Sequence, residues 1–157
     1  MRSAGILLHR RAADGGVEVL IAHMGGPFWA RKDAGAWSIP KGEFDPASES
    51  PASAARREFR EELGLEPPDG PYVELGTFAY SSGKRVTVFA ADGAGFSVEG
   101  AVFGEFELEW PPRSGAKRLF PEVDRVAWVA TDAARTLLVT GQRPAVDRLE
   151  EHLAAGR

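Results

Sequence analysis

The sequence predicts an α/β fold with a mixed central sheet and helices on both of its faces. Short apolar or alternating runs, typical of strands, occur in both halves of the chain. One amphipathic segment with helix start and stop signals separates them, and two further helical segments close the sequence. This order favours a layered α/β arrangement. The 157 residues are 43% hydrophobic, enough for a sizeable core, and we expect a single domain over residues 1–157.

The bulk composition excludes several functional classes. A net charge of −4 argues against non-specific binding to nucleic acid or to anionic membranes. The absence of cysteine excludes disulfides and thiolate chemistry, which leaves oxygen ligands or three histidines for any metal. No stretch approaches the ~20 apolar residues of a membrane span, and the N-terminal apolar run is too short for a signal peptide. We therefore expect a cytoplasmic protein.

The first elements are predicted to be strands. Residues 3–10 form a short apolar run suited to a buried strand, and residues 17–24 alternate enough to form a second. The Asp-Gly sequence between them favours a hairpin. Residues 25–42 are rich in glycine and proline but carry several aromatic residues. We expect a long ordered loop there, with a brief extended piece at 37–39.

A helix is expected next, over about residues 50–63. Pro51 suits its first turn and Gly64 suits its C-terminal stop. The candidates for its N-cap are Ser48, Ser50 and Ser53.

The second half of the chain returns to strands before it ends in helices. Alternating or apolar runs predict further strands at 72–80, 85–92, 104–110 and 125–130. Residues 111–124 are expected to form a loop that carries three basic residues. A short helix should begin at Thr131 or Asp132 and extend to about Val139, and an amphipathic helix should start at Pro144.

Three glutamates crowd the end of the central helix, at Glu58, Glu61 and Glu62. A helix turns about 100° per residue, so these side chains share about 100° of arc, beside an apolar stripe with Phe59 and Leu63. Arg57 is able to pair with Glu61 one turn on or with Glu49 two turns back. Like charges at such spacings destabilise a helix by about 0.2–0.5 kcal/mol per pair. The stripe is either a solvated charged face or a site for a cation.

The context of these glutamates resembles the Nudix box, G-x5-E-x7-R-E-U-x-E-E-x-G-U, in which U is a bulky apolar residue. The sequence reads Gly42-x6-Glu49-x7-Arg57-Glu58-Phe59-x-Glu61-Glu62-x-Gly64-Leu65. Every fixed position is present, with one extra residue between Gly42 and Glu49. That residue precedes the helix, so it should lengthen a loop and leave the glutamate arrangement intact. The resemblance implies the α/β/α sandwich of this family.

The resemblance also implies an activity and a metal. Nudix enzymes hydrolyse the diphosphate linkage of a nucleoside diphosphate joined to another moiety X, with Mg²⁺ as cofactor and Mn²⁺ as a substitute. The implied metal ligands are the backbone carbonyl of Gly42 and the side chains of Glu58, Glu61 and Glu62. The family usually adds one carboxylate from outside the box, for which Glu122 is our candidate. Weaker candidates are Glu107, Glu109 and Asp124. His9 and His23 lie at strand ends and are not expected to be ligands, because Mg²⁺ does not favour histidine.

The implied catalytic residues are Glu58, Glu61, Arg57 and Lys41. Glu58 or a loop carboxylate is the expected general base, and Arg57 is expected to orient the helix by pairing with a carboxylate such as Glu49. Lys41 lies in the motif Trp37-Ser-Ile-Pro-Lys41-Gly42, which resembles the W-x-(L/I)-P-K-G entry of Nudix enzymes acting on dinucleoside polyphosphates and related nucleotides. It would offset phosphate charge, or else be a solvated loop lysine.

Two further groups are candidates for substrate contact. The basic residues Arg113, Lys117 and Arg118 would grip a polyphosphate tail, or else form a solvated charge run. The aromatic residues Phe28, Trp29 and Tyr80 would stack on a nucleobase, or else belong to the core.

The favoured interpretation is a Mg²⁺-dependent pyrophosphohydrolase whose partner is a nucleotide-like small molecule, and we favour a dinucleoside polyphosphate or a nucleoside triphosphate. Its rivals within the family are an ADP-ribose or nucleotide-sugar hydrolase and a non-catalytic nucleotide sensor. A different metal-dependent phosphatase or a calcium-binding surface is a third interpretation. The sequence leaves the choice between monomer and homodimer undecided.

Overall fold

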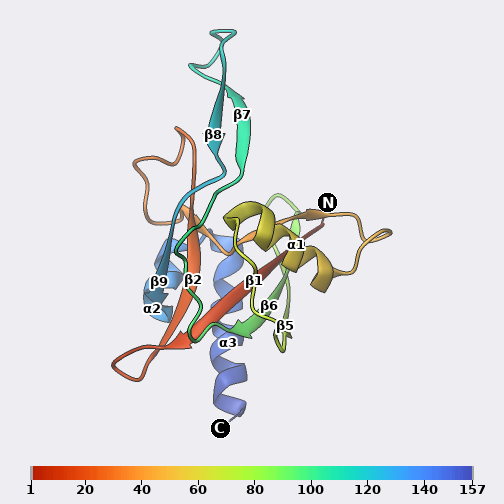
Figure 1. Cartoon of the computed structure of the whole chain (residues 1–157), viewed down its shortest axis with the longest axis vertical. Coiled ribbons are helices and arrows are strands. Elements are labelled where there is room, and N and C mark those ends of the chain that lie inside the picture. The colour runs from red at the N-terminus through yellow and green to blue at the C-terminus, as the bar shows by residue number, and fades with distance from the viewer. Residues whose placement is uncertain (1, 157) are drawn as a thin grey trace.

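Seven strands of residues 2–156, the part of the chain that the structure describes, form one mixed sheet (Figure 1). The structure is a computed structural model, and Met1 and Arg157 lie outside the described residues. The strands are β1 (Arg2–Arg11), β2 (Val17–Met24), β3 (Trp37–Ser38), β4 (Lys41–Phe44), β5 (Val73–Ala79), β6 (Arg85–Asp92) and β9 (Val123–Ala130). The α/β prediction with a mixed central sheet is confirmed.

Strand β1 organises this sheet. One of its edges pairs in parallel with β6, which in turn pairs with β5. Its other edge pairs with β2 only over residues 9–11 and with β4 over residues 2–5. Beyond its short pairing with β1, strand β2 pairs with β9 along one edge and with β3 near its C-terminal end. The short segment from β3 to β4 therefore enters the middle of the sheet, which places Lys41 and Gly42 beside Gly5 and Ala4.

Helices cover both faces of the sheet, as the sequence predicts. Helix α1 (Pro51–Leu63) packs on one face, and α2 (Thr131–Leu137), a 3-10 turn η1 (Thr140–Gln142) and α3 (Arg143–Ala155) cover the other (Figure 1). Successive strand residues point to opposite faces, so Leu8 packs in the cluster with Phe59 of α1 while Leu7 packs with Leu149 of α3. Burying a side chain such as Phe59 contributes about 1.5–3 kcal/mol. None of the helices within residues 2–156 is long and apolar enough to cross a membrane.

The ends of α1 follow from local sequence signals. The hydroxyl of Ser50 accepts a hydrogen bond from the backbone N–H of Ser53 at 3.2 Å, which makes Ser50 the N-cap. Pro51 occupies the first helical position, where it lacks an N–H that would have no partner. Gly64 adopts a left-handed φ of 65°, and its N–H donates to the carbonyl of Arg60 at 2.8 Å.

Two parts of the sequence-based assignment are wrong. Residues 41–44, which we expected in a loop, form β4. The predicted loop at 111–124 contains β8 (Lys117–Pro121), which pairs antiparallel with β7 (Glu105–Glu109), and it also contains the start of β9. The β7–β8 hairpin projects away from the main sheet (Figure 1). Its strands are held together by cross-strand pairs such as Phe106 with Phe120, which a single sequence segment does not reveal.

Candidate active site

The acidic stripe of α1 faces a cavity of about 1550 Å³. This cavity gathers six of the residues that the sequence singled out, from three separate parts of the chain: Lys41, Gly42, Glu58, Glu61, Glu62 and Glu122. Phe59 and Leu63, on the neighbouring stripe of the same helix, are fully buried against the sheet. The helix therefore separates its two stripes as its periodicity predicts, with one in the core and one at the cavity.

Backbone hydrogen bonds bring Glu122 to the end of α1. Its N–H donates to the carbonyl of Gly104 at 2.7 Å, and its carbonyl accepts the N–H of Gly25 at 2.9 Å. The N–H of Gly104 in turn donates to the carbonyl of Glu62 at 3.3 Å. Glu122 thus lies at the junction of β8 and β9 with its side chain free of these bonds. Sequence reasoning identified Glu122 but missed Gly104.

The weaker candidates lie elsewhere. Glu107 and Glu109 are on the projecting hairpin, and neither lines the cavity. Asp124 accepts from Nδ1 of His23 at 2.8 Å, and Nε2 of the same fully buried ring lies 2.7 Å from the carbonyl of Lys32. His23 therefore holds the loop after β2 and has no ring nitrogen left for a metal.

The Glu58 carboxylate approaches the backbone of Gly42 so closely that it leaves no room for a side chain at position 42. A Cβ placed on this residue would lie 1.9 Å from Oε2 of Glu58 and 2.1 Å from its carboxyl carbon. The carboxylate of Glu58 therefore rests directly against the Gly42 backbone. A side chain at position 42 would displace it.

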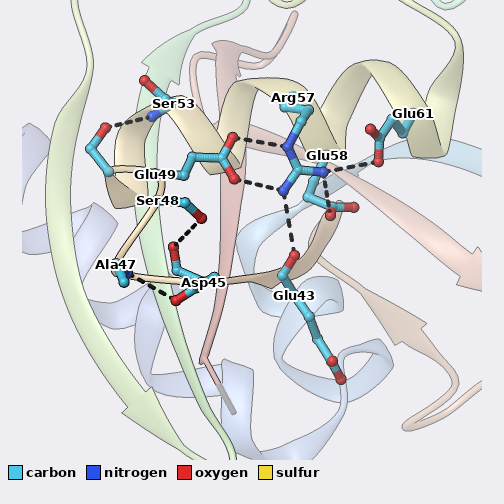
Figure 2. Close-up of polar contacts among 10 residues, drawn as sticks. Glu43, Asp45, Ala47, Ser48, Glu49, Ser53, Arg57, Glu58 and Glu61 are labelled. Atoms are coloured by element: carbon cyan, nitrogen blue, oxygen red, sulfur yellow. Dashed lines mark hydrogen bonds and ion pairs between the residues drawn. The ribbon is translucent and has the colours of Figure 1, made fainter.

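Arg57 forms the main ion-pair network of the site (Figure 2). Its Nε and Nη2 donate to the two carboxylate oxygens of Glu49 at 2.9 and 2.8 Å, and its Nη1 donates to Glu58 at 2.9 Å and to Glu61 at 3.1 Å. The hydrogen bond from Arg57 lowers the pKa of Glu49. Nη2 also reaches the carbonyl of Glu43 at 3.4 Å. The sequence predicted the partners Glu49 and Glu61, and the structure adds Glu58.

The extra residue between Gly42 and Glu49 is absorbed in a turn before the helix (Figure 2). The carbonyl of Asp45 accepts the N–H groups of Ser48 at 3.0 Å and Glu49 at 3.1 Å, and the Asp45 carboxylate accepts the N–H of Ala47 at 2.9 Å. Glu49 still reaches Arg57. The longer loop therefore still lets Glu49 pair with Arg57 on α1.

Electrostatics single out Glu62. Burial raises its pKa to about 8; Lys41 opposes this shift, while the negative charges of Glu122 and Glu58 add to it. The pKa of Glu58 is also raised, mainly by burial, although its bond with Arg57 acts in the opposite direction. Burial is thus the main cause of both shifts, and it disfavours the ionised forms of these two carboxylates.

The donor chemistry fits a hard divalent cation. Within residues 2–156, no group of three or more His, Asp or Glu side chains converges closely enough to form a ready-made metal site. Six carboxylates nevertheless line the same cavity, namely Glu43, Glu58, Glu61, Glu62, Glu105 and Glu122. Burial raises the pKa of Glu58 and Glu62, and a bound cation would favour their ionised forms. Carboxylate oxygens are the ligands that Mg²⁺ and Mn²⁺ prefer.

The rest of the cavity is lined by aromatic and hydroxyl-bearing side chains. Trp29, Phe78, Tyr80 and Phe106 contribute aromatic surface. Phe28 does not line it; its ring is 57% exposed and packs edge-on against Trp110. Sequence reasoning named Trp29 and Tyr80 but missed Phe106 and the fully buried Gln142, whose amide donates to the Tyr80 hydroxyl.

The three basic residues do not join the other candidates. Arg113, Lys117 and Arg118 lie on the β7–β8 hairpin or its turn, and none lines the cavity. The ammonium of Lys117 lies 3.6 Å from the carboxylate of Glu107 across the hairpin. Contact between these residues and a polyphosphate tail stays a prediction.

Comparison with known proteins decides the family. A model of the NUDIX domain matches residues 1–149. The chain belongs to the Nudix family. It is 32% identical over 143 residues to an 8-oxo-(d)GTP phosphatase of Mycolicibacterium smegmatis. This match covers 85% of the chain but only 36% of that relative, so the Nudix chain spans about a third of its length.

Solved structures agree on the Nudix fold. An Ap4A hydrolase of C. elegans, crystallised as a binary complex, superposes with a TM-score of 0.63 at 20% identity and covers 98% of each chain. The NUDIX domain of Shewanella oneidensis NrtR, crystallised with ADP ribose, has a TM-score of 0.63 at 17% identity, over 98% of this chain and 88% of that one. At these identities the likeness shows the shared fold.

Proposed function

We propose that this chain is a single-domain, Mg²⁺-dependent Nudix pyrophosphohydrolase that cleaves a diphosphate linkage in a nucleotide. The observation that carries the proposal is the convergence of Glu58, Glu61, Glu62 and Glu122 on one cavity with Lys41 beside them. A diphosphate bridge is a dense anion that repels an attacking water, so a site for its hydrolysis must neutralise charge before reaction. Carboxylates that hold divalent metal, next to a lysine, meet that requirement.

Each residue has a role that its position supports. Glu58, Glu61, Glu62 and Glu122, with the backbone of Gly42, would hold the metal. A bound Mg²⁺ would polarise phosphoryl oxygens and lower the pKa of a coordinated water. Glu58 is the favoured general base, because its pKa is raised by burial and its carboxylate lies at the cavity wall. Lys41 would offset phosphate charge, and Arg57 would hold the glutamates in place through its bonds to Glu49, Glu58 and Glu61.

For the substrate we favour a nucleoside triphosphate or a dinucleoside polyphosphate. The Pro-Lys-Gly segment before Glu43 supports this, and so does the likeness to a phosphatase named for 8-oxo-(d)GTP. The cavity volume exceeds the 300–1,000 Å³ that is usual for small-molecule sites, so it accommodates a substrate larger than one nucleoside. The rival interpretation, a nucleotide sensor, is disfavoured because the box retains every glutamate.

The test is a substrate panel with Mg²⁺ at about 5 mM, an order-of-magnitude choice above the affinity of typical sites. The panel contains diadenosine polyphosphates, nucleoside triphosphates including 8-oxo-dGTP, ADP-ribose and nucleotide sugars. Glu62→Gln is run beside wild type, and Glu66→Gln is the matched control, because Glu66 is an exposed glutamate just beyond α1 that pairs with Arg60.

We expect metal-dependent release of product from one substrate class, lost in Glu62→Gln and retained in Glu66→Gln. Nucleotide binding without turnover in wild type would favour the sensor. Equal turnover by wild type and Glu62→Gln would refute the proposed role of the carboxylates.

A further inference from the structure

We infer that Tyr80 is the residue that reads the nucleoside part of the substrate, by donating a hydrogen bond to an acceptor atom on it. This inference rests on the proposed function for its ligand class, a nucleotide. It goes further by assigning the uncharged part of the cavity to the nucleoside and by naming one recognition group there.

A buried amide fixes the role of the Tyr80 hydroxyl. Oε1 of Gln142 accepts the backbone N–H of Ile39 at 2.7 Å, and because a backbone N–H can only donate, this end of the amide is the oxygen. The opposite end is therefore the amino group. It donates to the hydroxyl of Ser38 at 2.9 Å and to that of Tyr80 at 2.8 Å. Gln142 is fully buried, so its orientation is enforced.

The Tyr80 hydroxyl is left with a proton to give. It already accepts from Gln142, whereas the Ser38 hydroxyl donates its own proton to the carbonyl of Ile39 at 2.8 Å. No acceptor among residues 2–156 takes the Tyr80 proton. Burial raises the pKa of Tyr80, so the phenol stays protonated at neutral pH. Because Tyr80 lines the cavity, a ligand there is the natural acceptor.

The ring itself is held in one place. A Cβ on Gly141 would lie 2.1 Å from Cδ1 of Tyr80, so the ring packs directly on that glycine. The backbone N–H of Tyr80 donates to the carbonyl of Lys84 at 2.8 Å. A donor that is fixed by both packing and hydrogen bonding is preorganised, which is the condition for selective recognition.

The cavity lining around Tyr80 matches a nucleoside and not a phosphate, because Lys84, whose charge acts on the Tyr80 hydroxyl, does not line the cavity. The cavity residues contributed by β5, the turn after it and η1 include no charged side chain, whereas every charged lining residue comes from β4, α1 or the segment 104–122. Trp29 and Phe78 supply aromatic surface, and Thr77 and Thr140 supply further hydroxyl groups. Gln142, which orients Tyr80, also binds Ser38 and Ile39. These two residues lie just before Lys41 in the chain, so the same network holds the segment that leads into the charged part of the cavity.

Binding measurements test the inference without turnover. Wild type, Tyr80→Phe and Tyr72→Phe are titrated by calorimetry with AMP, with GMP and with inorganic pyrophosphate, in Mg²⁺. Tyr72→Phe is the matched control, since it removes the hydroxyl of the other tyrosine, which donates to the carbonyl of Pro68 outside the cavity.

We expect Tyr80→Phe to weaken binding of AMP or GMP by about 3–10-fold, the usual worth of one hydrogen bond, and to leave pyrophosphate affinity unchanged. Tyr72→Phe should keep nucleotide affinity within about twofold, which is a small fraction of one hydrogen bond. The inference would be overturned if Tyr80→Phe bound nucleotide as tightly as wild type or lost pyrophosphate affinity in parallel. It would also be overturned if Tyr72→Phe lost as much nucleotide affinity, or if wild type bound no nucleotide. Silence in the substrate panel with Tyr80-dependent binding intact would refute the proposed hydrolase and leave this inference standing.

Discussion

Glu62→Gln is expected to make the metal-free protein more stable while it removes turnover. The reason is that folding places the Glu62 carboxyl in a poorly solvated position beside Glu58 and Glu122, with Lys41 offsetting only part of the cost. Glutamine has nearly the same shape and stays neutral, so it mimics the protonated side chain. The metal-binding role that we propose for Glu62 therefore works against folding when no cation is present.

The magnitude follows from the pKa of Glu62, about 8 in the folded protein against 4.5 for an ordinary glutamate. Between these two values the folded state binds more protons than the unfolded state, so rising pH lowers the free energy of unfolding. With about 1.36 kcal/mol per pKa unit, the cost at pH 8 is about 4 kcal/mol. For a chain of this size, about 1 kcal/mol corresponds to 2–4 °C in Tm, so the variant should melt roughly 8–16 °C higher.

Thermal melting with and without chelator, at pH 5 and at pH 8, measures this effect. In chelator, wild type and Glu62→Gln should melt at similar temperatures at pH 5 and diverge at pH 8. Excess Mg²⁺ should raise the Tm of wild type at pH 8 more than that of the variant, because binding to the native state stabilises it. Glu66→Gln should follow wild type throughout, since the pKa of Glu66 is lowered by its pairing with Arg60 and not raised.

Two results would refute this reasoning. A variant no more stable than wild type at pH 8 in chelator would show that the Glu62 carboxylate is not destabilising. A gain of equal size at pH 5 and pH 8 would show that the substitution acts through packing and not through charge.

Three further substitutions test the surroundings of the carboxylates. Arg57→Ala should reduce kcat and also lower stability by about 1 kcal/mol after allowance for solvent screening, and unchanged kcat and Tm would refute its orienting role. Gly42→Ala should displace the Glu58 carboxylate and reduce kcat by about tenfold or more, the scale of a misplaced catalytic group, with circular dichroism unchanged; wild-type kcat would contradict the close approach. Gly141→Ala should push the Tyr80 ring aside and weaken AMP or GMP binding as Tyr80→Phe does, and unaltered nucleotide affinity in calorimetry would argue against that packing.

The helix that carries the glutamates could be predicted because its signals are local. Ser50, Pro51 and Gly64 lie within or next to the helix they delimit, and the separation of Phe59 from Glu62 around its axis depends only on helical geometry. The same holds for most strands, whose alternation is visible within a few residues. Function could be approached from sequence for this reason, since three of the proposed metal ligands lie on that one helix.

The missed elements depend on partners that are distant in the chain. Lys41–Phe44 is a strand because Arg2–Gly5 lies beside it, and Lys117–Pro121 is one because Glu105–Glu109 pairs with it. Gln142 binds Ile39, which is 103 positions away. Nothing in the local sequence around such residues distinguishes them from a loop or from an exposed polar side chain, because tertiary contacts alone decide their state.

The structure places its candidate ligands in two different ways, and this difference explains the stability effect expected at Glu62. Arg57 holds Glu58 and Glu61 through their carboxylate oxygens, so these two acids have a counter-charge in the metal-free protein. Glu122 is placed instead by its backbone, through Gly104 and Gly25, and this leaves its carboxylate available. Glu62 differs from both. Its carboxylate is buried beside the negative charges of Glu58 and Glu122, and it forms no ion pair with Arg57. A cation bound there would relieve the carboxylate that the fold leaves least compensated, so metal affinity and metal-free instability should have the same origin.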